Sequence, residues 1–288
     1  MFNDIFKTRS CYGCIGSAVN TYSNNFNKIM KGTWLWVVIL SLLAGLATLT
    51  ASTTTGNTQS AYMSIAKYTG MGVLLLAVFF SSARVVSGVI SMTNGIALAY
   101  SMKKIIKVNA LILFMIMFIG MAIAIISLGI LQLKFVQSQP FTTIAISMIA
   151  LCIIIMILAA IFMAPMIYSV TRYIFLRDVK FREIFGKSYG LGFRHLGFLF
   201  TIACTTSLLF VVICVFLCMP GCITFFAYEI NLLGVLNGDA SGLPSYFVWL
   251  NALSSAIMSF ILQYLAIWVL LTYLYAYGGI DVVKSKND

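Results

Sequence analysis

Residues 102–134 read MKKIIKVNALILFMIMFIGMAIAIISLGILQLK, so three lysines lead directly into an uncharged apolar run over 108–133. A helix needs about 20 mostly apolar residues to cross the hydrocarbon core of a bilayer, and this run is long enough. Five further apolar runs divide the rest of the chain. The predicted spans are 34–52, 68–91, 108–133, 141–173, 194–219 and 247–277.

The composition agrees with a chain whose solvent is lipid. Hydrophobic residues make up 61% of the sequence and charged residues 9%, and the mean hydropathy is +1.03. A soluble chain of 288 residues could not bury that much apolar surface in one core. We therefore predict an all-α, polytopic membrane protein with six transmembrane helices, which form a single domain over 1–288.

Positive charge alternates between the connections. Of the 18 Lys and Arg residues, all but three lie before the first span, after the last, or in the second and fourth connections and at the span ends that border them. The exceptions are Lys67, Lys134 and Arg84, and Arg84 lies inside the second predicted span. Cytoplasmic loops are enriched in Lys and Arg, so we predict that both termini are cytoplasmic.

The net charge of +11 faces one side of the membrane in this topology. That distribution does not indicate nucleic-acid binding. It favours attraction to anionic lipid headgroups, to which each juxtamembrane Lys or Arg contributes about 1 kcal/mol. In the C-terminal tail, Lys284 and Lys286 have the spacing of a eukaryotic di-lysine retrieval signal, which keeps the endoplasmic reticulum membrane open as one location.

An amphipathic segment precedes each odd-numbered span, within 19–31, 98–107 and 180–189. In each segment apolar side chains recur at helical spacing on one face, and basic or amide side chains occupy the other. Such a helix lies in the membrane interface with its lysines at the phosphates. We predict three hairpin units, about 14–91, 92–173 and 174–280, each consisting of a cytoplasmic interfacial helix, a span out and a span back.

Interfacial aromatic residues are expected at the ends of the spans. Tyr273, Tyr275 and Tyr277 are predicted to mark the inner end of the last span in this way.

The candidate lipid-binding or anion-binding residues are basic side chains within or beside the spans. Arg84 either extends to the interface as a structural residue or contacts an anion or lipid. His195 is either a locally satisfied interfacial residue or a phosphate contact beside Arg194. The full set is Arg84, Lys103, Lys104, Lys107, Lys180, Arg182, Lys187, Arg194 and His195.

The last predicted span carries a polar stripe at every fourth residue. Polar side chains in hydrocarbon need partners, so these residues either hydrogen-bond to neighbouring helices or line a water-filled path. The stripe consists of Asn251, Ser255, Ser259 and Gln263.

Several chemistries have no support in the sequence. All seven acidic residues lie outside the predicted spans, which argues against a proton-coupled transporter. The single histidine excludes an H-E-x-x-H zinc site, and no Walker A pattern occurs. Cys214, Cys218 and Cys222 step by four, so metal binding or pairing by these thiols stays open. We expect no enzyme activity, no cofactor and no bound metal.

The segment FGKSYGLGFRHLG at 185–197, together with the repeated layout, resembles a loose group of bacterial six-span proteins. The group includes Bacteroidales membrane proteins and the membrane domain found beside some glycerophosphodiester phosphodiesterases. The resemblance implies an all-helical protein of the bacterial inner membrane, with no settled activity and no catalytic residues to carry across.

Two functions follow as hypotheses. The first is a non-enzymatic membrane protein that binds anionic lipid on the cytoplasmic side, or a partner subunit or second copy, through its basic interfacial helices. The alternative is a channel or uncoupled permease whose path runs between Arg84 and the polar stripe of the last span.

Overall fold

The structure, a computed structural model, describes residues 5–52, 61–94, 97–131, 141–239, 242–244 and 246–287. Within these ranges the chain is helical and contains no strand. Between α5 and α7 lie the 3-10 helix η1 (Phe181–Ile184) and the short helix α6 (Lys187–Arg194). The long helices are α1 (Cys11–Ser52), α2 (Ala61–Asn94), α3 (Leu98–Leu131), α5 (Phe141–Phe175), α7 (Leu196–Leu236) and α8 (Phe247–Asn287).

Each long helix contains a segment that is long and apolar enough to cross a membrane. In the part of the chain that the structure describes there are 6 such segments. They are Cys11–Thr50, Thr69–Thr93, Leu98–Ser127, Ile146–Phe175, Leu196–Val235 and Phe247–Val283. The prediction of an all-helical, multi-pass membrane protein is confirmed at this level.

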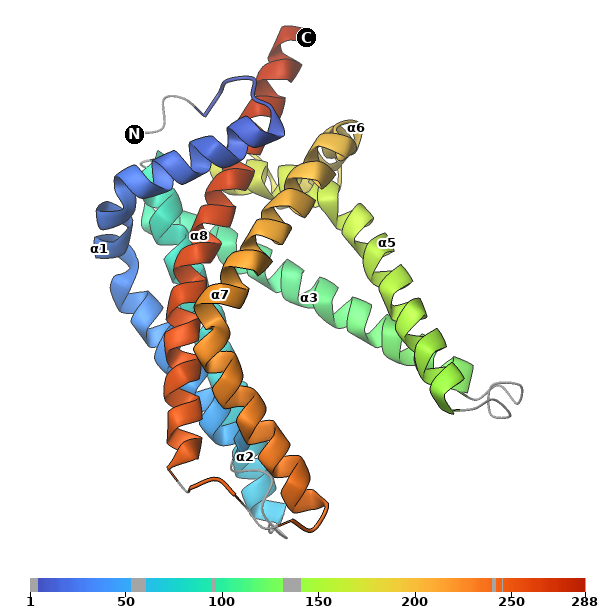
Figure 1. The fold of residues 1–288 in the computed structure, drawn as a ribbon. Helices are drawn as coiled ribbons and strands as arrows, with labels where there is room; N and C mark the ends of the chain where they lie inside the picture. The colour runs from blue at the N-terminus through green and yellow to red at the C-terminus, as the bar shows by residue number, and fades with distance from the viewer. Residues whose placement is uncertain are drawn as a thin grey trace.

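Helices α1, α2, α7 and α8 run close together, and α8 packs chiefly against α1 and α7 (Figure 1). The first part of α1 runs across one end of this bundle and the remainder runs along it (Figure 1). The last residues of α8 lie at the same end (Figure 1). Helices α3 and α5 diverge from the bundle toward the opposite end, and most of their side chains there are exposed.

One core of buried residues lies at the end of the bundle that holds the start of α1. Tyr168 of α5 and Tyr277 of α8 are both 0% exposed, and their ring centroids are 5.5 Å apart. Ile5, which precedes α1, is 1% exposed and lies against Gly278, where any side chain would collide with the Ile5 carbonyl oxygen. Tyr277 is therefore a core residue, and its prediction as an interfacial aromatic is wrong.

The second span, predicted to end at 91, ends close to the end of α2 at Asn94. The predicted end of the fifth span at 219 is wrong, because α7 continues through Pro220 to Leu236. A proline in a helix removes one backbone hydrogen bond, and packing against a neighbouring helix can hold the helix together there.

Helix α8 supplies that packing on the far side of Pro220. At Gly221 the missing side chain leaves room for Met258 of α8. One turn further along, the hydroxyls of Thr224 and Ser254 are 2.7 Å apart. These two contacts fix α7 against α8 beyond the proline.

The amphipathic segments take two forms. The first two are the initial parts of α1 and α3 and are continuous with the helices that follow, so they are not separate helices. The third is divided between η1 and α6, which are distinct from α7.

Candidate lipid-binding site

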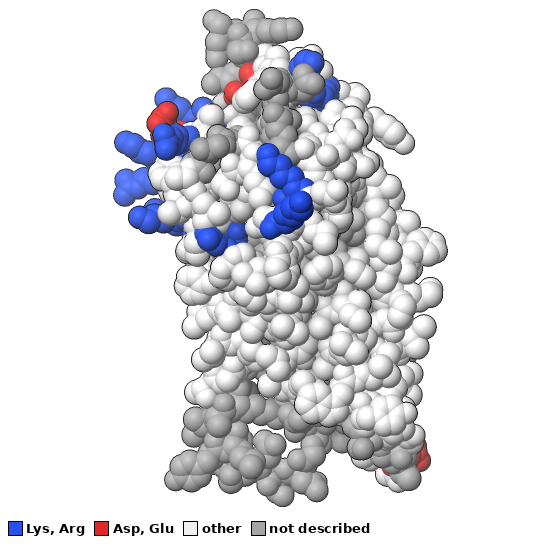
Figure 2. Space-filling view, turned by 90° about the vertical axis from the view of Figure 1, so that its left-hand side faces the viewer, with Lys and Arg blue, Asp and Glu red and all other residues white. Residues whose placement is uncertain are grey.

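Lysine and arginine gather at one end of the molecule. On the face drawn in Figure 2 the blue side chains lie in the upper part, at the end where α8 finishes in Figure 1, and the described surface below them carries no charge until the opposite end. Most of the predicted basic candidates are exposed. They are Lys103, Lys107, Lys180, Arg182, Lys187 and Arg194, whereas Arg84 and His195 are half-buried.

Lys104 differs from Lys103 and Lys107 because its ammonium group is hydrogen-bonded to backbone carbonyls inside the protein. The side chain is 6% exposed, and Nζ donates hydrogen bonds to the carbonyl oxygens of Tyr173 at 2.9 Å, Leu176 at 2.5 Å and Arg177 at 3.2 Å. Nζ also lies 4.7 Å from the ring centroid of Tyr173. The last carbonyls of a helix lack partners within the helix, and a cation there is favoured by the helix dipole. Lys104 thus fastens the start of α3 to the end of α5.

Arg84 faces α1. Its guanidinium carbon lies 5.6 Å from the ring centroid of Trp36, in the geometry of a cation–π contact. Two residues earlier on α2, and so on another side of the helix, Ser82 accepts a hydrogen bond from the amide of Asn109 on α3 at 3.2 Å. This part of α2 therefore joins α1 to α3.

Helix α6 is held along α5 by three contacts. Arg172 donates from Nη1 to the hydroxyl of Ser188 at 3.1 Å, and Tyr189 donates to the carbonyl of Phe162 at 3.0 Å. Gly192 lies against the backbone of Pro165, where an added Cβ would be 2.5 Å from the carbonyl oxygen. Pro165 has no N–H for the carbonyl of Ile161, and the Tyr189 hydroxyl bonds the next carbonyl along α5, that of Phe162. These contacts fix the position of the basic residues on α6.

The polar stripe of α8 does not meet Arg84 in any contact that the described residues show. Asn251 is 4% exposed and its Oδ1 has no partner, and no side-chain hydrogen bond joins Ser255, Ser259 or Gln263 to another described residue. Neighbouring positions of α8 instead pack closely against α1 at Gly45 and against α7 at Gly221. The described geometry therefore offers nothing in favour of a path between Arg84 and the stripe.

An apolar cavity of about 450 Å³ lies mainly between α3 and α5, with α2, α7 and α8 completing its walls. On α3 it extends from Ile105 to Met115, and on α5 from Ala160 to Ile174, so it occupies the parts of both helices nearest the basic end. Ile112 and Ala160, at the end of the cavity away from the lysines, remain exposed. The cavity is within the range of about 300–1,000 Å³ that is typical of ligand pockets.

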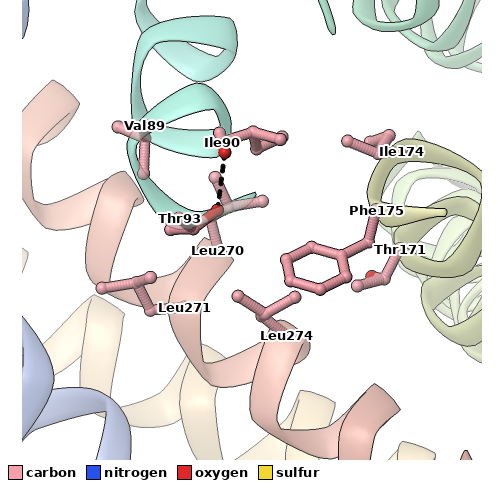
Figure 3. A pocket seen from close by; sticks show the side chains of 9 residues that line it. All are labelled: Val89, Ile90, Thr93, Thr171, Ile174, Phe175, Leu270, Leu271 and Leu274. Atoms are coloured by element: carbon pink, nitrogen blue, oxygen red, sulfur yellow. Dashed lines mark hydrogen bonds between the residues drawn. The ribbon is translucent and has the colours of Figure 1, made fainter. Parts of the chain in front are cut away.

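The cavity narrows toward the basic end. A small pocket of about 20 Å³ shares Thr171, Ile174 and Leu270 with it. The ring of Phe175 points from α5 toward α8 across this pocket, beside Leu274 (Figure 3). The space there holds about one water molecule, so the cavity ends at this constriction.

A polar cluster beside the core was not predicted. Tyr168 donates to Oδ1 of Asp281 at 3.4 Å. Both the Tyr277 hydroxyl and Nε of Arg172 are buried without a hydrogen-bond partner. The sequence signal was present, because Asp281 follows Tyr277 by four residues, but nothing in the sequence placed Tyr168 and Arg172 of α5 beside them.

The seven cysteines are free thiols, and Cys218 is buried. Among the described residues no group of three or more His, Cys, Asp or Glu side chains could hold a metal ion. Comparisons with known protein families, curated proteins and solved structures found no match to this chain.

Proposed function

We propose that the protein is a non-enzymatic, multi-pass protein of the bacterial inner membrane, with both termini in the cytoplasm, that binds anionic phospholipid headgroups at its basic end. In this proposal the chain forms three hairpin units. Their leading segments, at the start of α1, at the start of α3 and in η1 with α6, lie at the headgroup level of the inner leaflet.

The observation that carries the proposal is the gathering of exposed Lys and Arg at one end of the molecule. Below them, the described residues on the face drawn in Figure 2 carry no charge until the opposite end. The anionic surface of a cytoplasmic leaflet attracts such a group by about 1 kcal/mol for each Lys or Arg near it. The contacts of α6 with α5 add to this, because they hold Lys187 and Arg194 in place relative to the spans. Lys104 is omitted from the binding set, since its ammonium is engaged by three carbonyl oxygens.

The test is a charge-neutral variant of the η1 and α6 region, with Lys180→Gln, Arg182→Gln and Lys187→Gln together. These side chains are exposed, so the fold should persist. The loss of about 3 kcal/mol of attraction should lower the retention of phosphatidylglycerol roughly 100-fold. Native mass spectrometry of the gently extracted protein measures the retained lipid as added mass.

A variant with Lys180→Arg and Lys187→Arg is the matched control, because it changes the side chains and keeps their charge. It should retain lipid as the unaltered protein does. An unchanged amount of bound phosphatidylglycerol in the charge-neutral variant would contradict the proposal.

A further inference from the structure

On α3 two exposed lysines border the residues that line the apolar cavity. Lys103, Lys107, Leu111 and Met115 recur at every fourth residue, so each lies beside the next in a row that turns gradually around the helix. The two lysines are exposed, and Leu111 and Met115 line the cavity. We propose that this row of four residues, called the α3 ladder below, binds one anionic phospholipid. The phosphate lies at the two lysines and one acyl chain lies in the cavity between α3 and α5.

The dimensions fit a lipid of the leaflet at the basic end. With a rise of 1.5 Å per residue, Lys103 and Met115 are about 18 Å apart along α3. Because α3 is inclined to the bundle (Figure 1), the depth between them is smaller and lies within half of the hydrocarbon core, which is about 15 Å thick. A phosphate at the lysines therefore places the first part of an acyl chain over Leu111 and the middle of the chain beside Met115.

An acyl chain can enter the cavity from the side, between α3 and α5. At the basic end the cavity closes to the small pocket crossed by Phe175 (Figure 3). At its other end Ile112 and Ala160 are both exposed. An acyl chain of the surrounding bilayer thus reaches the cavity through its exposed side between α3 and α5 and need not pass the constriction.

Lys104 lies between the two lysines of this row but does not belong to the proposed phosphate site. Lys104 points toward the end of α5, where the carbonyls of Tyr173, Leu176 and Arg177 accept from it. Lys103 and Lys107, at the exposed side of the helix, remain for a phosphate. The lining of the cavity offers no competing charge, since Asn109, Thr171 and Tyr273 are its polar members and the rest are apolar.

This inference rests on the proposed function, because both assign an anionic lipid to the basic end. The experiment below distinguishes a failure of the acyl-chain site from a failure of the proposed function. The full chain is reconstituted in phosphatidylcholine vesicles that contain phosphatidylglycerol with a photoreactive diazirine in its acyl chain. After irradiation, peptide mass spectrometry locates the adducts. Met115 and Met163, which line the cavity, should carry more adduct than Met121 of α3 and Met156 of α5, which are exposed outside it.

Two sets of variants test the two halves of the site. Lys103→Gln with Lys107→Gln should lower labelling of Met115 by phosphatidylglycerol about 30-fold, from about 1 kcal/mol for each lysine, and leave labelling by diazirine phosphatidylcholine unchanged. Ala160→Phe fills the exposed end of the cavity and should lower labelling by both lipids. Ala150→Phe makes the same change at an exposed position of α5 outside the cavity and should have no effect.

Equal labelling of Met115 and Met121, or labelling of Met115 that Ala160→Phe leaves unchanged, would overturn the acyl-chain site. If lipid retention still depends on Lys180, Arg182 and Lys187 in that case, the proposed function stands without this site. If the cavity variants abolish labelling and the Lys180, Arg182 and Lys187 variant retains its lipid, the α3 ladder stands and the basic η1 and α6 region has no part in lipid binding.

Discussion

Replacing Lys104 with methionine is expected to lower the free energy of unfolding by about 3 kcal/mol. The substitution keeps an apolar stem of similar length and removes the donor to three carbonyl oxygens at the end of α5. A hydrogen bond to a charged group contributes about 1.5–3 kcal/mol, and buried acceptors left without a donor add a desolvation cost of about 1–3 kcal/mol. Unfolding of the purified protein in detergent, followed by circular dichroism, measures the loss.

Lys103→Met and Lys107→Met are the controls for this prediction. Both side chains are exposed on the same helix, so each change should alter stability by less than about 0.5 kcal/mol. A similar loss for all three variants would show that Lys104 has no special role in joining α3 to α5.

The second large effect is expected at Gly192 of α6, where alanine should destabilise the protein by about 1–3 kcal/mol. Its Cβ would lie 2.5 Å from the carbonyl oxygen of Pro165, and a backbone atom of α5 cannot move aside as the end of a side chain can. The same substitution at Gly190, two residues earlier, meets nothing within 4 Å. There alanine should stabilise the helix by up to about 1 kcal/mol, because its helix propensity exceeds that of glycine.

The pair Gly192→Ala and Gly190→Ala is therefore predicted to shift the unfolding midpoint in opposite directions. The measurement is thermal unfolding of both variants in the same detergent. Shifts of the same sign would mean that α6 is not held against Pro165 as the structure describes.

Hydrophobic run length predicted the six long helices, because each helix must satisfy its own backbone in lipid. It did not predict the course of α7. The predicted span ends at 219, directly before Pro220 and Gly221, and the helix persists because Met258 and Ser254 of α8 pack beyond the proline. Such a contact depends on a helix that comes later in the chain, so a local pattern does not contain it.

The roles of the lysines on α3 also depend on a contact with a later helix, which a local sequence pattern does not contain. Lys103, Lys104 and Lys107 look alike in the sequence, and all three were predicted as lipid-binding candidates. The end of α5, about 70 residues later, separates Lys104 from the others by giving it three acceptors. The cavity was likewise out of reach, since its walls come from five helices.

The claim that the basic end faces the cytoplasm underlies the proposed lipid binding, and cysteine accessibility tests it most directly. In a cysteine-free background, Arg182→Cys places a thiol at the basic end, and Gly242→Cys places one at an exposed residue between α7 and α8. A membrane-impermeant maleimide added to intact cells should label the Gly242→Cys variant, and should label the Arg182→Cys variant only after the membrane is permeabilised. Labelling of Arg182→Cys in intact cells would contradict the orientation and, with it, the assignment of the basic end to the inner leaflet.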